Sequence, residues 1–495
     1  MPKIFSMLFN SIEFAIFLPI VFILYWAVFN KNIKVRNIFL LVVSYIFYGW
    51  WDWRFLSLII ISSFVDYFVG INLQKNDNNE KKRKVFLLIS IFVNLGFLGF
   101  FKYFNFFIDN FYEAFTFFGK QFSKPVLNVI LPVGISFYTF QTMSYSIDVY
   151  RRKMKPTKDI FAFFAYVSFF PQLVAGPIER AKNLLPQFFE PKKFDYAQAA
   201  DGMRQILWGF FKKIVIADNA AVYVNEIFSN YTHYHGLTLL WGAVLFAFQI
   251  YGDFSGYSDI AIGTAKLFNF TLMRNFAYPY FSRDIAEFWR RWHISLSSWF
   301  KDYVYIPLGG SRVGKWKAIR NTFVIFLVSG FWHGANWTFI VWGALNAAYF
   351  LPLQLAKKNR KNIDIVAKDK FLPSIKEFMQ IGITFFLTVI AWVFFRSETI
   401  GKAFDYLKLL FSKNIFTYMS LKNTYEIRHV ISQPVLVVMF GILILFEWLQ
   451  RRKQFGLDFS SNTPKFLRWS VYIIVCLLII VYGNFARVEF IYFAF

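Results

Sequence analysis

An apolar stretch of 35 residues carries the most information about the fold. Residues 321–355 read NTFVIFLVSGFWHGANWTFIVWGALNAAYFLPLQL and include one histidine, His333. Cytoplasmic loops of membrane proteins are enriched in Lys and Arg. Both ends of the stretch should therefore face the cytoplasm, because basic residues flank it on either side: Arg312, Lys315, Lys317 and Arg320 before it, and Lys357, Lys358, Arg360 and Lys361 after it. The stretch has to enter the membrane and return.

Glycines mark the expected turn of this hairpin, at Gly330 and in the sequence Gly-Ala-Asn at 334–336. From Thr322 to Trp332 there are 11 residues. In a helix they extend about 16 Å, roughly half the hydrocarbon thickness of a bilayer. Spacing and charge together predict that His333 lies near the middle of the membrane.

The composition extends this interpretation to the whole chain. Of its 495 residues, 57% are hydrophobic and 17% are charged, whereas an average soluble domain carries about 25% charged residues. The net charge of +25 comes from short basic clusters between apolar runs, which is the pattern of a polytopic membrane protein and not of a nucleic-acid-binding one. The single cysteine, Cys476, excludes an intramolecular disulfide.

Five apolar runs in the first part of the chain alternate across the membrane without conflict with the loop charges. The first, residues 12–29, is followed by Lys31, Lys34 and Arg36, which places its C-terminal end in the cytoplasm. It is too long for a signal-peptide core and lacks a small-residue cleavage site, so we expect it to be retained. The following runs are residues 37–51, 55–73, 85–107 and 129–149.

Two later segments do not fit a simple crossing. Residues 161–175 contain Pro171 and have basic flanks on both sides, which predicts a re-entrant element buried in protein. Residues 282–300 interleave charged and aromatic side chains, which predicts an amphipathic helix on the cytoplasmic side. The remaining runs are 200–224, 239–267, 382–395, 435–448 and 471–484. We expect an all-α polytopic membrane protein with one membrane domain, residues 1–495.

Ionisable side chains inside a membrane are costly and usually mark a pathway or a site. His333 is therefore a candidate general base, and its depth and flanking glycines favour this over a hydrogen-bonded core histidine. His293 is either a second active-site group or part of a polar cluster. His233 and His235 have no third ligand nearby, so a zinc site is not expected, and His429 belongs to no constellation.

Asp253 and Asp259 interrupt an otherwise apolar span. Each has a polar partner four residues away, Tyr257 for Asp253 and Ser255 for Asp259. The two carboxylates either line a hydrated funnel or hydrogen-bond between helices, and the sequence slightly favours the second interpretation.

Two near-motifs are excluded. Residues 309–315 have the spacing of a phosphate-binding loop, but Trp316 occupies the place of the metal-binding Ser or Thr. Residues 252–256 read GDFSG, which is not the G-x-S-x-G nucleophile elbow. An acyl transfer on this chain would therefore proceed by direct, base-assisted attack and not through a covalent acyl-enzyme.

Six segments together resemble the membrane-bound O-acyltransferase superfamily, specifically its bacterial alginate O-acetylation branch. They include DYVYIPLGG at 302–310, GFWHGANW at 330–337 and FIYFAF at 490–495; the full set is 134–138, 171–177, 251–263, 288–310, 330–337 and 490–495. The resemblance covers nearly the whole chain. It implies a ring of helices thinned at its centre, with His333 as the catalytic histidine and His293 as the second one.

The resemblance also implies a reaction and partners. We expect acetyl transfer from a cytoplasmic thioester, acetyl-CoA, as substrate with no bound cofactor or metal, onto an exported polysaccharide such as alginate. A partner acetyltransferase outside the cytoplasm would complete the transfer, and the chain would lie in the bacterial cytoplasmic (inner) membrane. Relatives acetylate peptidoglycan or pass D-alanine to teichoic acid.

Further expectations concern the chemistry around His333. Asn336 is a candidate oxyanion donor because of its proximity in sequence. Arg312, Lys315 and Lys317 either bind the donor's phosphates or only set topology. A rival interpretation is a transporter or flippase of acylated or lipid-linked sugars that performs no chemistry.

Overall fold

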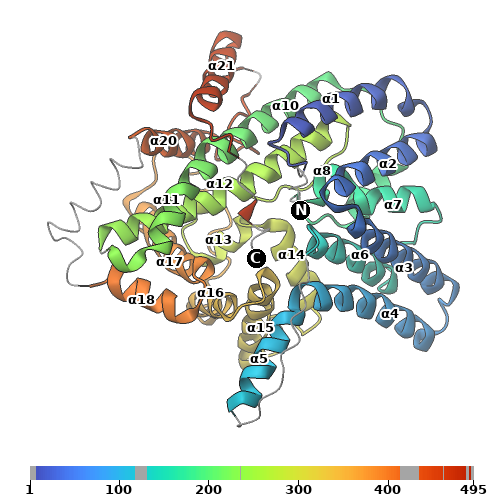
Figure 1. Cartoon of the computed structure of the whole chain (residues 1–495), viewed down its shortest axis with the longest axis horizontal. Helices are drawn as coiled ribbons and strands as arrows, with labels where there is room; N and C mark the ends of the chain where they lie inside the picture. Colours follow the sequence, from blue (N-terminus) through green and yellow to red (C-terminus); the bar gives the residue numbers. More distant parts are fainter. Residues whose placement is uncertain are drawn as a thin grey trace. The chain divides into compact units, whose positions relative to one another are not determined.

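The structure is a computed structural model that describes residues 7–117, 131–174, 176–234, 236–412, 434–460, 462–486 and 490–491. In these ranges the chain is helical and contains no strand. It forms two compact units, Met1–Gly202 with Ala261–Met273, and Met203–Ile260 with Arg274–Phe495 (Figure 1). The chain passes between the units inside α10 (Tyr196–Phe210), inside α12 (Leu237–Leu267) and between Met273 and Arg274. The prediction of one membrane domain over residues 1–495 stays a prediction.

The first unit contains the five runs predicted for the first part of the chain, except that residues 129 and 130 of the fifth run are outside the described ranges. In it α3 packs against α4 and α6, and α2 packs against α7. A π-helical turn, Gly99–Tyr103, joins α4 to α5, so the fourth run is longer than predicted. The helices are α1 (Ile12–Ala27), α2 (Ile33–Asp52), α3 (Leu56–Lys75), α4 (Glu80–Leu98), α5 (Phe104–Phe117), α6 (Ile135–Tyr150), α7 (Ile160–Ser168), α8 (Phe170–Leu173) and α9 (Ala181–Leu184).

The predicted re-entrant segment is a broken helix. Phe169 leaves the helical conformation between α7 and α8, and both short helices are almost entirely buried in the first unit. Backbone of this kind needs protein around it to satisfy its polar groups. The segment therefore has the structure expected of a re-entrant element, while the side on which its ends lie stays a prediction; Ala175, its last residue, is outside the described ranges.

A buried carboxylate joins three helices of the first unit. Asp66 of α3 accepts hydrogen bonds from Ser90 and Asn94 of α4 and from Ser146 of α6. The Asn94 Nδ2 to Asp66 Oδ2 distance is 2.7 Å. Buried polar groups of this kind are stable only when hydrogen-bonded, so these contacts define the packing of α3, α4 and α6.

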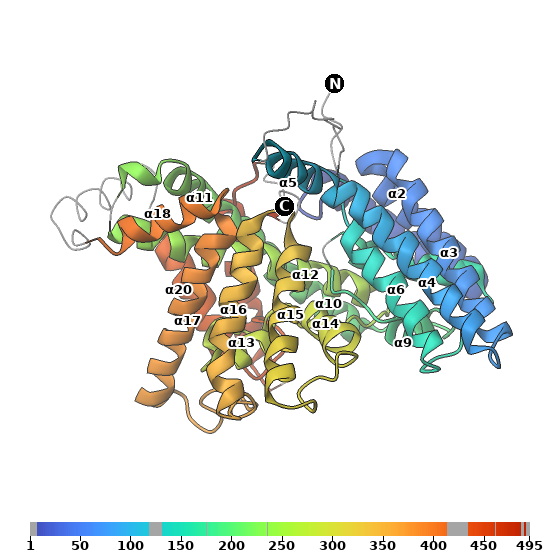
Figure 2. The same ribbon diagram turned by 90° about the horizontal axis from the view of Figure 1, so that it is seen from below.

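The second unit contains the candidate site. Figure 2 shows α15, α16 and α17 side by side, and α16 packs against both of its neighbours. The elements are α10 (Tyr196–Phe210), a π-helical turn (Phe211–Ala217), α11 (Asp218–Ser229), α12 (Leu237–Leu267), α13 (Ile285–Arg291), α14 (Ile294–Phe300), a second π-helical turn (Lys301–Tyr305), α15 (Lys315–His333), α16 (Trp337–Leu355), α17 (Ile375–Arg396), α18 (Ile400–Leu410), α20 (Pro434–Leu449) and α21 (Lys465–Tyr482).

The predicted hairpin is confirmed as α15 and α16, which turn at residues 334–336. A β-carbon on Gly330 would lie 2.2 Å from the carbonyl oxygen of Phe339, and one on Gly343 would lie 2.4 Å from that of Phe326. The two helices thus touch backbone to backbone where glycine allows it. The predicted depth of His333 was counted from Thr322, but α15 begins seven residues earlier, at Lys315. The length of the helix therefore does not fix how deep His333 lies in the membrane, and that depth stays a prediction.

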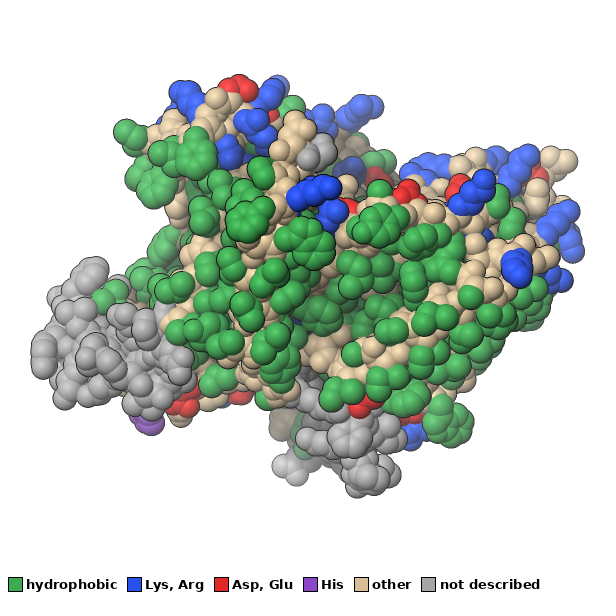
Figure 3. Space-filling model, turned by 90° about the horizontal axis from the view of Figure 1, so that it is seen from above, with side chains coloured by type: hydrophobic (Ala, Val, Ile, Leu, Met, Phe, Trp, Pro, Cys, Tyr) green, Lys and Arg blue, Asp and Glu red, His purple; other side chains and the backbone are tan. Residues whose placement is uncertain are grey.

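Exposed apolar surface confirms a multi-pass membrane protein. Among the residues described, six helical stretches are long and apolar enough to cross a bilayer: Ile33–Lys75, Glu80–Thr116, Leu237–Leu267, Trp337–Leu355, Ile375–Arg396 and Lys465–Tyr482. On α21 the side chains of Ile473, Leu477 and Ile480 are more than half exposed. Figure 3 shows hydrophobic side chains covering much of the visible face, as lipid contact requires.

Candidate active site

His333 is the last residue of α15 and is enclosed by aromatic rings. Its side chain is 3% exposed. The rings of Trp332, Trp342 and Phe395 meet it edge to face, with centroids 4.9, 5.1 and 5.3 Å from that of the imidazole. Trp342 comes from α16 and Phe395 from α17, so three helices build the enclosure. Such a surrounding excludes water and strengthens electrostatic interactions inside it.

The segment around His293 differs from the prediction of one amphipathic helix over 282–300. It forms two seven-residue helices, α13 and α14, and His293 between them has φ +44°. The break is held by two backbone hydrogen bonds to the segment before α13: Asn275 O accepts the Ile294 N–H, and the Ala277 N–H donates to Arg291 O. The apolar side chains of Phe288 and Trp292 are buried, whereas Arg290 is exposed. The single-helix prediction was wrong.

The imidazole of His293 is 1% exposed. Its Nδ1 lies 3.1 Å from Asn275 Oδ1. Burial lowers the pKa of His293 from its ordinary value of 6.5 to about 3, so the ring is neutral near pH 7. A non-glycine residue in the left-handed region costs of order 1–3 kcal/mol and is retained where the surrounding structure requires it.

The two histidines share a neighbour. The indole of Trp332 lies 4.9 Å from the ring of His333 and 6.1 Å from the ring of His293, centroid to centroid. Both candidate catalytic residues thus lie in one aromatic region of the second unit. The resemblance had implied two histidines, and the structure brings the rings of both close to one tryptophan.

Asp253 and Asp259 both form ion pairs with lysines of the π-helical turn Phe211–Ala217. Lys213 Nζ is 2.7 Å from Asp253 Oδ1 and also 2.7 Å from Asp218 Oδ1. Lys212 Nζ is 2.5 Å from Asp259 Oδ2. All of these side chains are buried. These contacts agree with hydrogen bonding between helices, and a funnel lined by the two carboxylates stays a prediction.

Asn336 caps a helix. Its Oδ1 accepts the N–H of Thr338 at 3.0 Å, which satisfies a donor at the start of α16, and its Nδ2 donates to Glu398 O at 2.8 Å. Both the oxygen and the nitrogen of the side-chain amide therefore have hydrogen-bond partners. The role of Asn336 at an oxyanion stays a prediction.

The three candidate donor-binding cations are exposed. Arg312 lies in the loop before α15, and Lys315 and Lys317 lie in its first turn. None of the three has an ion pair within the part of the chain that the structure describes. They are free to meet an anionic ligand, while His333 lies at the other end of the same helix.

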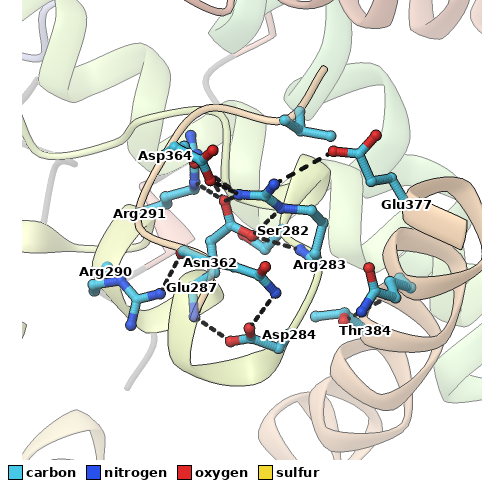
Figure 4. Close-up of polar contacts among 12 residues, drawn as sticks. Ser282, Arg283, Asp284, Glu287, Arg290, Arg291, Asn362, Asp364, Glu377 and Thr384 are labelled. Carbon is cyan, nitrogen blue, oxygen red and sulfur yellow. Dashed lines mark hydrogen bonds and ion pairs between the residues drawn. The ribbon is translucent and has the colours of Figure 1, made fainter. Parts of the chain in front are cut away.

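A cluster of charges fastens α13 to the loop between α16 and α17 (Figure 4). Arg283 donates through Nε to Glu287 Oε2 at 3.0 Å and through Nη2 to Asp364 Oδ1 at 2.8 Å. The bond from Arg283 holds the pKa of Asp364 below its ordinary value. Asn362 Nδ2 also donates to Asp284 Oδ2, at 2.7 Å, and Asp284 caps α13. The loop thereby fixes the start of the helix that leads to His293.

Sequence reasoning missed four buried polar residues of this unit. Lys212 and Lys213 interrupt an apolar run, a signal that could have identified them. Glu447 accepts a hydrogen bond from Tyr251 Oη at 2.7 Å. Asn275, the partner of His293, gave no signal because it lies outside any periodic segment.

His233 lies in a short 3₁₀ turn, whereas His235 and His429 are outside the described residues. Groups of three or more His, Cys, Asp or Glu side chains that could hold a metal do not occur in the parts of the chain described.

Comparison with known proteins finds one matching family model and several similar proteins. The model of the membrane-bound O-acyltransferase family matches residues 148–395, which include both histidines. A probable alginate O-acetylase of Pseudomonas putida is 40% identical over 407 residues, 82% of this chain and 80% of the relative. A peptidoglycan O-acetyltransferase of Helicobacter pylori is 36% identical over 435 residues, again 82% and 80%. A teichoic acid D-alanyltransferase of Bacillus subtilis is 29% identical over 261 residues, 50% and 64%.

Proposed function

This chain belongs to the membrane-bound O-acyltransferase family, and from that premise we propose that it carries acetyl groups from a cytoplasmic thioester, acetyl-CoA, across the membrane for O-acetylation of an exported polysaccharide such as alginate. Membership makes the chain an O-acyltransferase, so a transporter without chemistry is set aside. The observation that carries the proposal is the pair of buried histidines whose rings both lie close to Trp332, inside the segment that the family model matches.

The proposed reaction is a direct transfer. An acceptor hydroxyl attacks the thioester carbonyl, the new C–O bond forms as the C–S bond breaks, and the thiol leaves with a proton. His333 accepts the hydroxyl proton and returns it to the departing sulfur. The enclosure by Trp332, Trp342 and Phe395 supports this role, because it keeps water from competing as the acceptor. Holding both reactants in line supplies further acceleration.

Donor binding is assigned to Arg312, Lys315 and Lys317. Their exposure and lack of ion pairs within the described ranges support phosphate binding. Eighteen residues separate Lys315 from His333 along α15, about 27 Å. A donor anchored at these cations needs a long flexible arm to bring its thioester to the imidazole, which acetyl-CoA and a carrier-protein thioester both possess.

The acceptor side is assigned from the relatives. The alginate and peptidoglycan acetylases are similar to this chain over about four fifths of its length. An exported polysaccharide places the end of the transfer outside the cytoplasm. We therefore assign the chain to the bacterial inner membrane, with an acetyltransferase partner on the outer side that passes the acetyl group to the polymer.

Right-side-out membrane vesicles from producing cells test this function. They are loaded with acetyl-CoA labelled in the acetyl group, and ester-bound label is measured in polysaccharide outside; a second arm replaces the donor by acetylated carrier protein. We expect label with acetyl-CoA and none with His333→Ala vesicles of equal protein content. Equal label in both vesicle types would overturn the function, and label from carrier protein alone would overturn only the donor.

A further inference from the structure

Asn275 is the polar centre around His293. It lies between α12 and α13 and is fully buried. Its Oδ1 lies 3.1 Å from His293 Nδ1, 2.9 Å from Ser295 Oγ and 3.3 Å from the backbone nitrogen of Ser295. Its Nδ2 lies 3.1 Å from Ser258 Oγ on α12. One side chain thereby joins α12, the turn at His293 and the start of α14.

These contacts settle which end of the amide faces the histidine. The backbone N–H of Ser295 can only donate, so the amide atom that it meets has to be the oxygen. The nitrogen of the amide then faces Ser258 Oγ, which accepts. Since Asn275 Oδ1 is an acceptor only, the Nδ1 of His293 carries the proton and donates it to this bond.

The other ring nitrogen is therefore an acceptor. In the neutral imidazole with a proton on Nδ1, the lone pair is on Nε2. Nε2 is buried and has no hydrogen-bond partner among the residues that the structure describes. Its surroundings are aromatic: Phe254 meets the ring edge on at 4.6 Å, and Phe276 and Trp332 lie at 6.4 and 6.1 Å. A buried acceptor without a partner is costly unless a ligand completes it.

We propose that Asn275 is a positioning residue that fixes the tautomer and orientation of His293, so that Nε2 accepts a hydrogen bond from the thiol released in acyl transfer, once His333 has returned the proton to its sulfur. The inference rests on the proposed function for the identity of that group. The left-handed backbone at His293 contributes to the same end, because it turns the side chain out of the path of a continuous helix. Without Asn275 the proton can move to Nε2, and the ring can no longer accept there.

The surroundings of His293 give this arrangement a pH signature. Phe254 from α12, Trp332 from α15 and Phe276 before α13 face the ring, and none of them titrates; Asn275 and Ser295 are neutral. Asn275→Asp would place a carboxylate beside Nδ1 and stabilise the protonated imidazole. In the wild type the imidazole of His293 stays neutral well below pH 7. In the variant the pKa of His293 would be higher, so Nε2 would become protonated and stop accepting a hydrogen bond at a higher pH.

The first experiment measures kinetics in the vesicles described above. In Asn275→Ala we expect kcat to fall about as far as in His293→Ala and no further, with little change in KM for acetyl-CoA. Asn94→Ala is the matched control, since it removes an equally buried amide in the other unit, far from either histidine in sequence. Asn275→Asp should keep activity at high pH and lose it toward low pH, earlier than wild type. A loss in Asn275→Ala no larger than in Asn94→Ala would overturn the proposal.

The second experiment needs no substrate. Nitrogen-15 NMR of histidine-labelled full-length protein reads which ring nitrogen carries the proton, and His293→Gln identifies the signal. We expect Nδ1–H with bare Nε2 in wild type and a shift toward Nε2–H in Asn275→Ala. An unchanged tautomer would overturn the positioning role. The expected tautomers in a protein that transfers no acetyl would overturn the proposed function and leave the role of Asn275 intact.

Discussion

The rings of His333 and Trp342 meet edge to face with their centroids 5.1 Å apart, although the two residues lie on opposite arms of one helical hairpin. That contact depends on how closely the arms approach. The position of His333 relative to Trp342 therefore depends on the glycines at which the two arms touch. Substitutions at those glycines test the packing of the hairpin.

Gly330→Ala should weaken the hairpin. The added β-carbon would meet the carbonyl oxygen of Phe339 at 2.2 Å, so α15 and α16 would have to separate. We expect a loss of about 1–3 kcal/mol of stability, measured by thermal unfolding in detergent. Gly382→Ala is the control: that position on α17 is open, and alanine there should be neutral or stabilising by up to about 1 kcal/mol. Equal behaviour of the two variants would contradict the close approach.

His333→Ala should abolish most of the transfer. Losing a general base costs about 10²–10⁴-fold in rate, while the rings around His333 should still hold the fold, as checked by gel filtration and thermal unfolding. His333→Gln keeps a hydrogen-bonding group but cannot take the proton, so we expect the same loss. His293→Ala should impair transfer to a smaller extent. Retention of more than about a tenth of wild-type transfer by His333→Ala would refute the assignment of the base.

Replacing Arg312, Lys315 and Lys317 together by Gln should raise the apparent KM for acetyl-CoA and leave kcat nearly unchanged. All three are exposed, so the fold should tolerate the change. The matched control replaces Lys81, Lys82 and Lys84, which are also exposed and lie on the first unit. If both triple variants give the wild-type KM, the three cations serve topology alone.

Orientation can be read with single cysteines in a Cys476→Ala background. Cys476 is exposed, so it has to be removed first. Lys81→Cys and Lys358→Cys lie in basic segments predicted to be cytoplasmic and should resist a membrane-impermeant thiol reagent added to intact cells. Thr232→Cys should react, because we expect the run 200–224 to lead out of the cytoplasm and the run 239–267 to return, which places the loop between them outside. Reaction of both cytoplasmic positions would overturn the topology and the predicted depth of His333.

Lys213→Met should destabilise the second unit strongly. The substitution leaves Asp218 and Asp253 buried without the cation that lies 2.7 Å from each. Removing one partner of a buried ion pair typically costs about 3–5 kcal/mol. Lys266→Met, which breaks a less buried pair with Asp201, should cost less. Thermal unfolding of the two variants measures both losses of stability. Equal losses would contradict a larger contribution from the ion pairs of Lys213 than from that of Lys266.

The helical class, the membrane character and the hairpin could be predicted because they depend on local patterns. Apolar runs and basic loops report the environment of each segment directly. The same patterns predicted the turn at Gly330 and at residues 334–336. The structure has the turn at 334–336, just after His333, whereas Gly330 lies inside α15, so that part of the prediction was wrong.

The break at His293 could not be predicted in this way. Residues 282–300 have the alternation of an amphipathic helix, but the backbone of Asn275, distant in sequence, binds Ile294 and ends the helical pattern. Asn275 and Glu447 escaped notice for the same reason, since their partners come from other elements. The buried polar contacts join residues on different helices, and one sequence alone does not indicate which of these residues will meet.

The neighbouring lysines at 212 and 213 have a mechanical consequence. They reach carboxylates on α12 that are six residues apart, Asp259 and Asp253, which is about 9 Å along that helix. Both bonds are short, so sliding α12 along the π-helical turn Phe211–Ala217 would lengthen both of them. We therefore expect this turn and α12 to move together as one body.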